Sequence, residues 1–326
     1  MPEPQTPTYE DVLRARKQIA PYLLRTPLHE YPALNDLVGA RVFIKHENHQ
    51  PTGAFKVRGG INLISQLSDD ERARSVIAAS TGNHGQSVAY AAHLFGVGAR
   101  IVVPENANPG KVASMRGLGA EVIFHGARFD QARAHCEALA EQHGLRYVHS
   151  GNEPLLIAGV ATATVEMLED QPDLEVIIVP VGGGSGAAGA CIVARELNPA
   201  IRVIGVQSEA SNAACESWRE HRLLERPNTT LAEGLATGTG FAMPQAILWE
   251  SLSDFVLVSD AQILRAMVWL IEHAHTLAEA AGAAAMAAAY ELREGLHDKK
   301  VGVICSGGNA TPDQVRMALN AVGSEK

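Results

Sequence analysis

Short apolar runs rich in valine and isoleucine alternate, along most of the chain, with longer segments whose apolar residues recur every three or four positions. Runs of the first kind predict β-strands, and segments of the second kind predict amphipathic α-helices. The predicted strands are residues 42–45, 76–79, 101–103, 122–124, 176–179, 203–206 and 301–304. The predicted helices are residues 9–19, 86–95, 110–118, 130–143, 186–197, 261–274 and 311–319, and the alanine-rich stretch 278–289 predicts a further, buried helix.

This alternation of strands and helices is typical of parallel sheets that are covered by helices on both faces. A chain of 326 residues exceeds what one ordinary small core needs. We therefore expect an α/β protein with two lobes, each an open parallel sheet in a three-layer arrangement. A capping-box pattern of Thr8 and Asp11 marks the start of the first predicted helix.

The composition narrows the possible function. Hydrophobic residues make up 46% and charged residues 19% of the chain, which indicates a packed globular protein. A net charge of −9 without blocks of like charge argues against nucleic acid as a partner. Four widely spaced cysteines without a CxxC pair favour free thiols in a reducing compartment, the cytoplasm. The polar residues 1–8 are unlike a signal peptide, and no apolar run of about 18 residues predicts a membrane span.

The first candidate motif is Thr52-Gly53-Ala54-Phe55-Lys56, which comes just before a helical run. A lysine becomes a useful nucleophile when partial desolvation lowers its pKa. An aromatic neighbour and a preceding glycine turn suit a buried, accurately aimed amine at Lys56. The alternative interpretation is a solvated surface lysine, and the spacing alone does not decide against it.

The second motif, Ser80-Thr81-Gly82-Asn83-His84-Gly85, stands between a predicted strand and a predicted helix. Backbone N–H groups at a helix N-terminus bind anions, and the two glycines let a ligand approach closely. A substrate carboxylate fits this turn. The alternative is a polar connection in which Asn83 or His84 caps the helix.

The third motif, the 182–186 loop, has the sequence Gly-Gly-Gly-Ser-Gly between a strand and a helix and predicts a phosphate site. Gly184, Gly186 and Gly189 also satisfy GxGxxG, and Glu209 follows the next strand. That pattern is typical of dinucleotide-binding proteins, so a nicotinamide-dependent oxidoreductase is an alternative. Tight packing of a helix on a strand is a third reading. A fourth motif, Cys305-Ser306-Gly307-Gly308-Asn309, follows the last strand, where Ser306 could hydrogen-bond a ligand ring or merely form a turn.

Together these motifs resemble the fold-type II pyridoxal-phosphate enzymes, whose fold is like that of the tryptophan synthase β chain, and in particular the serine/threonine dehydratase and serine racemase branch. The resemblance runs from residues 25–28 to residues 306–309. The family's Glu-x-x-Gln-x-Thr-Gly-Ser-Phe-Lys stretch is matched by Glu47, Gln50, Thr52, Gly53, Phe55 and Lys56. Its Ser-x-Gly-Asn-His-Gly stretch is matched by Ser80, Gly82, Asn83, His84 and Gly85, and its tetraglycine loop is similar to residues 182–186.

The resemblance implies a role for each matching residue. Lys56 would hold pyridoxal 5'-phosphate as a Schiff base and later move the Cα proton of the substrate. Phe55 would flank the cofactor ring, Asn83 would bond its phenolic oxygen, and Glu279 would line its far side. The phosphate would be held by backbone N–H groups of Gly182, Gly183, Gly184, Ser185 and Gly186. The substrate carboxylate would be held by Ser80, Thr81, Gly82, Asn83 and His84.

Ser306 would face the pyridine nitrogen, and this implies a particular reaction. A neutral hydroxyl there should leave the nitrogen mostly unprotonated, and the ring is then a weaker electron sink than with a carboxylate partner. Such a site favours β-elimination over transamination. The predicted function is therefore a lyase, an ammonia-lyase (dehydratase) that converts a β-hydroxy L-amino acid such as threonine or serine to a 2-oxo acid and ammonia.

Several positions depart from the family pattern. Ala54 stands where the family usually has serine, and residues 158–162 read Ala-Gly-Val-Ala-Thr in place of Ala-Gly-Gln-Gly-Thr. Thr81 stands where racemases have a second serine, the acid/base of the opposite face. Its hydroxyl could serve there, so Thr81 is a second catalytic candidate and amino-acid racemisation is an alternative reaction.

Some relatives bind a divalent cation through a glutamate, a carbonyl and an aspartate. Glu209 and Ala213 match the first two positions, but Cys215 occupies the third. A thiol is a poor ligand for a hard cation, so we expect no metal.

The resemblance also implies the organisation of the protein. Residues 48–150 would form a small mobile domain, and residues 1–47 and 151–326 a large domain that binds the cofactor. The cofactor would lie between them, and substrate binding would close the small domain. We expect a cytoplasmic homodimer acting on a small-molecule amino acid. The chain ends soon after Ser306, so we expect no regulatory domain and a catabolic role.

Overall fold

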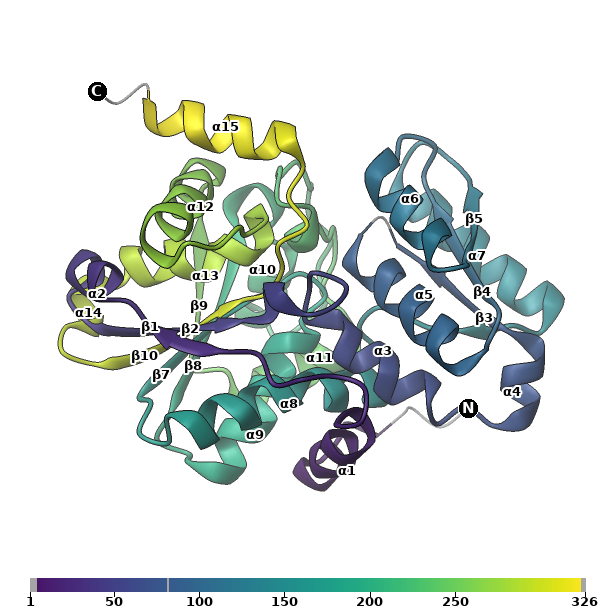
Figure 1. Ribbon diagram of the computed structural model, residues 1–326, viewed down its shortest axis with the longest axis horizontal. Helices are drawn as coiled ribbons and strands as arrows, with labels where there is room; N and C mark the ends of the chain where they lie inside the picture. The colour runs from purple at the N-terminus through teal and green to yellow at the C-terminus, as the bar shows by residue number, and fades with distance from the viewer. Residues whose placement is uncertain (1–4, 81, 324–326) are drawn as a thin grey trace. The chain divides into compact units, whose positions relative to one another are not determined.

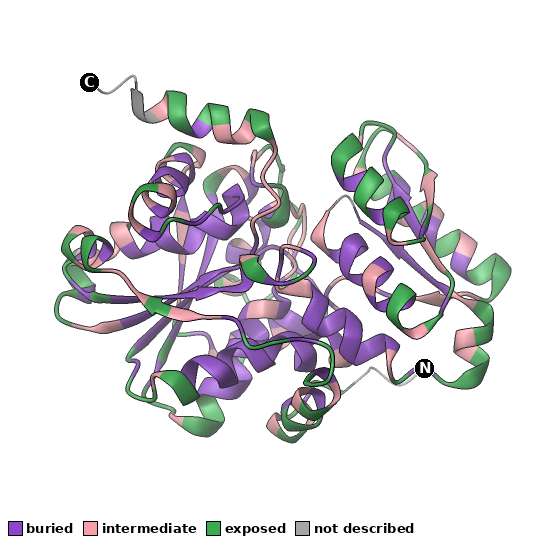
Figure 2. Cartoon of the chain, viewed as in Figure 1, coloured by how far each residue is buried: buried purple, intermediate pink, exposed green. Residues whose placement is uncertain are grey.

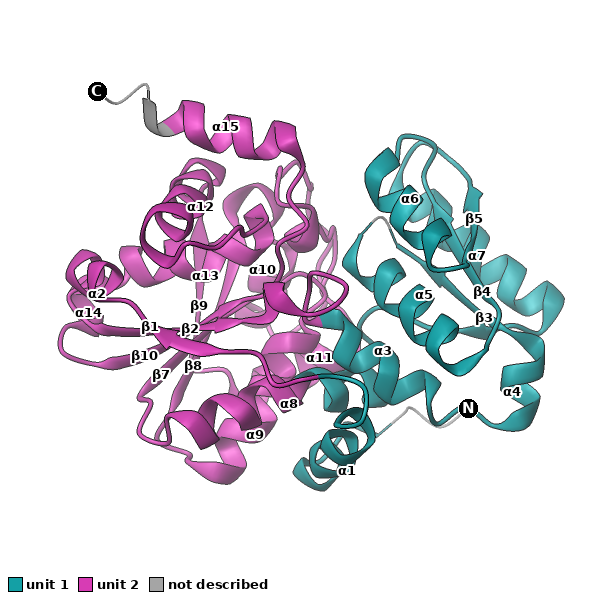
Figure 3. Cartoon of the chain, viewed as in Figure 1, with its two compact units in different colours: residues 1–23, 56–160 teal, residues 24–55, 161–326 magenta. Residues whose placement is uncertain are grey.

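Two compact units make up the computed structural model, which describes residues 5–80 and 82–323 (Figures 1 and 3). Within the described residues, the first unit comprises residues 5–23, 56–80 and 82–160, and the second comprises Leu24–Phe55 and residues 161–323. Helix α8 (Pro154–Asp170) contributes to both units, because the division falls after Val160. The domain boundaries expected from the sequence remain a prediction.

The first unit is built on a parallel sheet with the strand order β5-β4-β3-β6 among its described residues. The strands are β3 (Val76–Ala79), β4 (Ala99–Val103), β5 (Glu121–Phe124) and β6 (Arg146–Tyr147). Helix α7 packs on one face, where its buried Cys136 meets Ile77 and Val102. The helices are α1 (Tyr9–Ile19), α3 (Lys56–Ile64), α4 (Asp69–Arg74), α5 (Asn83–Phe95), α6 (Pro109–Gly117) and α7 (Phe129–His143).

The second unit is built on a larger sheet with the strand order β1-β2-β10-β7-β8-β9 among its described residues. All neighbours run parallel except β1 and β2, which are antiparallel. The strands are β1 (Leu28–Glu30), β2 (Arg41–His46), β7 (Val176–Pro180), β8 (Arg202–Ser208), β9 (Asp254–Val258) and β10 (Lys300–Cys305). The helices are α2 (Pro32–Val38), η1 (Glu47–His49), α9 (Ser185–Leu197), η2 (Glu209–Ser211), α10 (Ala213–Arg219), η3 (Glu233–Leu235), α11 (Ala242–Ser251), α12 (Asp260–Ala274), α13 (Ala280–Glu291), α14 (Arg293–Leu296) and α15 (Pro312–Gly323).

Helix α13 forms the centre of the core of the second unit. It packs against four strands of the sheet, and its residues from Ala280 to Ala289 are all buried (Figure 2). Alanine suits this position because it has the highest helix propensity and lets a helix approach a sheet closely. The predicted buried helix is therefore confirmed. Across the described residues, no helix combines the length and the apolar character that crossing a membrane would require.

The predicted α/β class with parallel sheets is confirmed, and every predicted strand and helix is present. The capping box is confirmed too, since Thr8 and Asp11 bond each other's backbone N–H groups. Strands β1 and β6 were not predicted, because they are only three and two residues long, and β9 was not predicted although it contains the apolar run Phe-Val-Leu-Val. Helix α8 was not predicted either, because its residues 156–168 are buried on all sides and show no amphipathic period.

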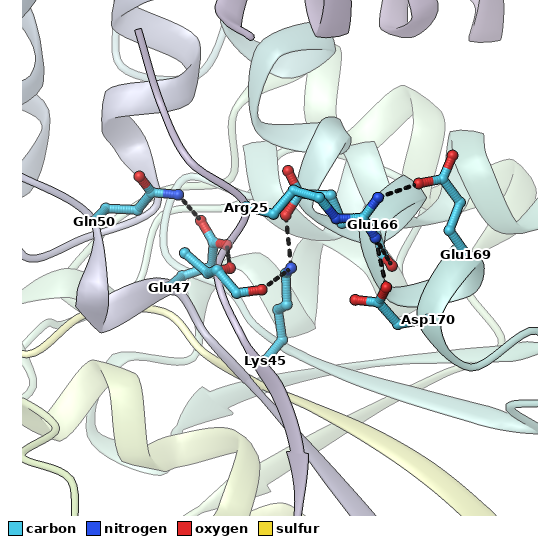
Figure 4. A network of polar contacts seen from close by, with 8 residues as sticks. Arg25, Lys45, Glu47, Gln50, Glu166, Glu169 and Asp170 are labelled. Atoms are coloured by element: carbon cyan, nitrogen blue, oxygen red, sulfur yellow. Dashed lines mark hydrogen bonds and ion pairs between the residues drawn. The ribbon is translucent and has the colours of Figure 1, made fainter.

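A buried polar network supports the strand that leads to the Lys56 motif (Figure 4). Lys45, fully buried at the end of β2, donates from Nζ to Glu166 Oε2 at 2.6 Å and to the Thr26 carbonyl at 2.8 Å. Thr26 in turn donates to the buried Glu47 carboxylate at 2.6 Å. Since a buried charge is tolerated only when it is paired and hydrogen-bonded, this network fixes the position of β2 and of the turn that follows it.

The Lys45–Glu166 pair generates a prediction about stability. Lys45→Met should lower the free energy of unfolding by about 3–5 kcal/mol, because the Glu166 carboxylate would be left buried without its cation. The double variant Lys45→Met/Glu166→Leu should be more stable than Lys45→Met alone. Urea unfolding followed by circular dichroism measures both.

The matched control is Lys300→Met, which removes the ion pair of Lys300 with the exposed Asp173. It should cost less than about 1 kcal/mol, because water screens such a pair. Equal losses for Lys45→Met and Lys300→Met would contradict the interpretation.

Candidate active site

The Thr52–Phe55 stretch and the Ser306–Asn309 stretch, distant in the sequence, are hydrogen-bonded to each other in the second unit. Phe55 N–H donates to the Ser306 carbonyl at 3.0 Å, and Ala54 forms an antiparallel bridge with Gly307. Gly53 has a φ of +67°, and a Cβ there would lie 2.5 Å from Asn309 Oδ1. Only glycine fits both requirements. The first and fourth sequence motifs therefore form one structural unit.

Lys56 is the first residue of α3 and belongs to the first unit. Its half-buried side chain donates from Nζ to the carbonyl oxygen of Ser150 at 3.1 Å. Burial lowers the pKa of the Lys56 amine from 10.5 to about 8. The positive end of α3 acts in the same direction, since it disfavours an ammonium group. Lys56 is thus a lysine whose neutral, nucleophilic form is accessible near neutral pH.

The 80–85 turn connects β3 to α5 in the first unit. The buried Ser80 Oγ accepts from the N–H groups of Gly82 at 3.1 Å and Gly85 at 2.9 Å, so it shapes the turn. Asn83 begins the helix after Gly82, and neither Asn83 nor His84 caps it. The capping interpretation is therefore wrong. The predicted position Thr81 lies outside the described residues.

His84 is buried and donates from Nε2 to the Val148 carbonyl at 3.0 Å. Burial, together with the charge of Lys56, lowers the pKa of His84 to about 3, so its ring is neutral. A buried cation stands close by. The amine of Lys111 lies 3.6 Å from the place that a Cβ on Gly82 would take. A turn of N–H groups with a lysine beside it suits a carboxylate.

The 182–186 loop connects β7 to the N-terminus of α9 in the second unit. Gly184 has a φ of +86°, which places the helix N-terminus behind a left-handed turn. A Cβ on Gly182 would lie 2.2 Å from the Gly234 carbonyl, and one on Gly183 would lie 2.4 Å from the Phe241 ring. Thr237 Oγ1 donates to the Gly182 carbonyl at 3.2 Å and braces the loop. The glycines thus let the loop pack closely on its neighbours where α9 begins, and the N–H groups of a helix start are suited to binding an anion.

A backbone hydrogen bond connects Glu279 to Gly307, the residue that follows Ser306 in the chain. The side chains of Glu279 and Ser306 are buried, and Glu279 N–H donates to the Gly307 carbonyl at 3.0 Å. Gly282 allows this packing, because a Cβ there would lie 2.2 Å from the same carbonyl oxygen. Glu279 and Gly282 are therefore packed directly against the turn that contains Ser306.

Each unit contains groups whose chemistry fits pyridoxal phosphate. The first unit offers a partly desolvated lysine, Asn83 and a carboxylate turn. The second offers a glycine-rich loop at a helix N-terminus, with the Phe55 ring 3.3 Å from a Cβ on Gly186. It also offers the buried hydroxyl of Ser306. An amine, a phosphate cradle and a neutral partner for a ring nitrogen are what this cofactor requires.

Comparison with known proteins gives the family. The sequence model described as "Pyridoxal-phosphate dependent enzyme" matches residues 19–307. The chain belongs to this family of pyridoxal-phosphate-dependent enzymes, and the predicted fold type, cofactor and lyase class are confirmed.

Two curated relatives and one solved structure illustrate the branch. The chain is 38% identical to an L-threonine ammonia-lyase of Thermotoga maritima, over 96% of this chain and 78% of the relative. It is 38% identical to an L-threo-3-hydroxyaspartate ammonia-lyase of Saccharomyces cerevisiae, over 98% of both chains. It superposes on maize serine racemase with a TM-score of 0.91 at 29% identity, over 98% of this chain and 99% of that one.

The structure also explains the dinucleotide-like pattern. A Cβ on Gly189 would lie 2.9 Å from Ala161 of α8, so this glycine serves helix–helix packing. Glu209 is exposed on η2, whereas Cys215 is buried and its thiol donates to the Phe255 carbonyl at 3.9 Å. No cluster of metal-ligating side chains occurs among the residues that the structure describes. The expectation that no metal binds stays a prediction.

Three polar residues of the first unit lie near the predicted site residues but were not predicted from the sequence. Lys111 lies by the 80–85 turn, and His149 and Ser150 lie in the segment that meets Lys56. None stands in a motif, and a lysine in a helix reads as a surface residue. Only the tertiary structure reveals them.

The lowered pKa of Lys56 predicts how the cofactor-free protein captures pyridoxal phosphate. Only the neutral amine attacks the cofactor's aldehyde, so the rate at Lys56 should rise with pH up to about 8 and then level off. Borohydride reduction at a series of pH values, followed by mass spectrometry, measures the rate and locates the modified residue. Lys56→Ala should show no capture at this position. A rate that keeps rising to pH 10.5, the ordinary lysine value, would contradict the argument from burial.

Proposed function

We propose that this chain is an ammonia-lyase that converts a β-hydroxy L-amino acid, such as threonine or serine, to a 2-oxo acid and ammonia by β-elimination. The observation that carries the proposal is the partly desolvated amine of Lys56, held by the Ser150 carbonyl at the start of α3. The names of the relatives, an L-threonine ammonia-lyase and an L-threo-3-hydroxyaspartate ammonia-lyase, support the same reaction class.

Backbone N–H groups of Gly182, Gly183, Gly184, Ser185 and Gly186 would bind the cofactor's phosphate. Phe55 and Glu279 would line the ring, Asn83 would donate to its phenolic oxygen, and Ser306 would face its nitrogen. When bound, pyridoxal phosphate withdraws electrons from the substrate's Cα and stabilises the negative charge that builds there.

Lys56 would act as the base at the substrate's Cα. Its amine can remove a proton only in the neutral form, and burial makes that form available near pH 8. The neutral Ser306 side chain would limit how strongly electrons are drawn into the ring. Loss of the β-hydroxyl would then compete well with transamination.

The 80–85 turn would hold the substrate's carboxylate through Ser80, Gly82, Asn83 and His84. Its N–H groups and the nearby Lys111 amine supply the positive potential that a carboxylate needs. Thr81 would complete the turn, and its hydroxyl is the group on which the alternative reaction, racemisation, depends.

A screen of candidate substrates tests this proposal. Threonine, serine, 3-hydroxyaspartate and phenylserine are each incubated with the protein, and 2-oxo acid and ammonia are measured together. We expect equal amounts of the two products from at least one of these amino acids, and none from Lys56→Ala. Inversion at Cα without ammonia, seen as loss of optical activity with serine and as a new diastereomer with the other three, would instead indicate a racemase. If neither reaction occurs with any of them in protein that carries the cofactor, the proposal is wrong.

We further propose that the protein is a cytoplasmic homodimer. The four buried, free cysteines support a reducing compartment. Light scattering coupled to size-exclusion chromatography should give twice the chain mass of 34.6 kDa. A mass of one chain at micromolar concentration would overturn the dimer proposal.

A further inference from the structure

The 148–152 segment, which joins β6 to α8 in the first unit, contacts both functional motifs of that unit. The Val148 carbonyl accepts from His84 Nε2 at 3.0 Å. Two residues further on, the Ser150 carbonyl accepts from Lys56 Nζ at 3.1 Å. One short stretch of backbone therefore holds the candidate cofactor lysine and the candidate carboxylate turn.

The two ends of this segment are tied together. Arg146, in β6, makes a bidentate ion pair with the buried Glu153: Nη1 donates to Oε1 at 2.8 Å and Nη2 donates to Oε2 at 2.9 Å. Such a paired geometry is strong and directional. The ion pair thus closes the base of the loop, and the conformation of residues 149–152 decides where the Ser150 carbonyl points.

The imidazole of His149 fixes the interior of the loop. Its Nδ1 accepts from the N–H groups of Gly151 at 3.0 Å and Asn152 at 2.9 Å. This side-chain-to-backbone turn is the kind that an asparagine or aspartate oxygen usually makes. Since Nδ1 accepts twice, it carries no proton, and the proton of the neutral ring is on Nε2.

The neutral state of His149 is favoured by its surroundings. Burial lowers the pKa of His149 to about 4, and the positive charges of Arg133 and Lys56 act in the same direction. Among the described residues, Tyr147 of β6 faces the ring edge-on at 6.0 Å, and His84 of α5 is neutral. Protonation of Nδ1 would break both turn bonds, so the turn is intact above about pH 4 and is lost below it.

We propose that His149 is a positioning residue for Lys56: its imidazole locks the turn that aims the Ser150 carbonyl at the Lys56 amine. This inference rests on the proposed role of Lys56 as the cofactor lysine. Gly151 follows Ser150 and has wide conformational freedom, so the peptide group between them can rotate unless a side chain restrains it. A carbonyl accepts only an N–H, and it leaves the lone pair of the neutral amine available for reaction.

Two variants of His149 separate an acceptor effect from a packing effect. His149→Leu keeps an apolar side chain of moderate size but has no acceptor. His149→Asn is smaller, yet its Oδ1 can accept from the N–H two residues on. In the capture assay described above, with cofactor-free full-length protein, we expect His149→Leu to slow attachment of pyridoxal phosphate at Lys56 about tenfold. His149→Asn should come within about threefold of the unchanged protein.

The matched control is His135→Leu. His135 is a partly buried histidine of the same unit, on α7, and its ring stacks on His125 at 3.9 Å. It should capture the cofactor at the unchanged rate. Urea unfolding of each variant shows whether slow capture merely follows lost stability.

The outcomes distinguish this inference from the proposed function. Fast capture at Lys56 by His149→Leu would overturn the role of His149 and leave the cofactor lysine in place. Equally slow capture by His149→Asn and His149→Leu, at equal stability, would also overturn it. Capture by the unchanged protein at another lysine would overturn both.

A second measurement needs no variant and covers the case in which His149→Leu does not fold. Nitrogen chemical shifts of the His149 ring report which nitrogen carries the proton. An unprotonated Nδ1 that persists down to about pH 5 is expected. A proton on Nδ1 at neutral pH would overturn the inference.

Discussion

The burial of the Lys56 amine is the constraint on which the rest of the site depends. An amine in water is protonated at neutral pH and cannot act as a nucleophile, so the protein must remove water from it without offering it a carboxylate. Lys45, in the same chain, is also removed from water but does have a carboxylate partner. It is fully buried and paired with the Glu166 carboxylate, and its role is structural. The two lysines lie eleven positions apart in numbering, and their partners, a carboxylate and a carbonyl, give them different chemistry.

The functional segments share one architectural origin, the carboxyl end of a parallel strand. The 80–85 turn follows β3, the 148–152 segment follows β6, the 182–186 loop follows β7, and Ser306 follows β10. Strands of a parallel sheet end at the same edge, and ligands bind there because loops and helix N-termini meet at that edge. Each sheet thus presents its polar groups together, while valines and isoleucines fill its interior.

The sequence allowed the elements and the motifs to be predicted, but not the contacts that give the motifs their precision. Strand β3 and helix α1 were predicted to the residue, because a uniform apolar run and a capping box are local signals. Helix α8 was missed, since burial on every side removes the periodic pattern. His149 and Lys111 were missed for another reason. Their roles depend on neighbours that are distant in sequence, and a single histidine or lysine carries no signal of its own.

The buried cysteines of the two units can report on local unfolding. All four cysteines are buried, and burial raises the pKa of Cys136 and Cys191 to about 12 and that of Cys215 to about 11, with Cys305 shifted upward as well. Because the thiolate is the reactive form, alkylating reagents can modify these positions only where the chain opens. Cys136 belongs to the first unit and the other three to the second. The order in which the cysteines become labelled under mild denaturant therefore shows which unit opens first.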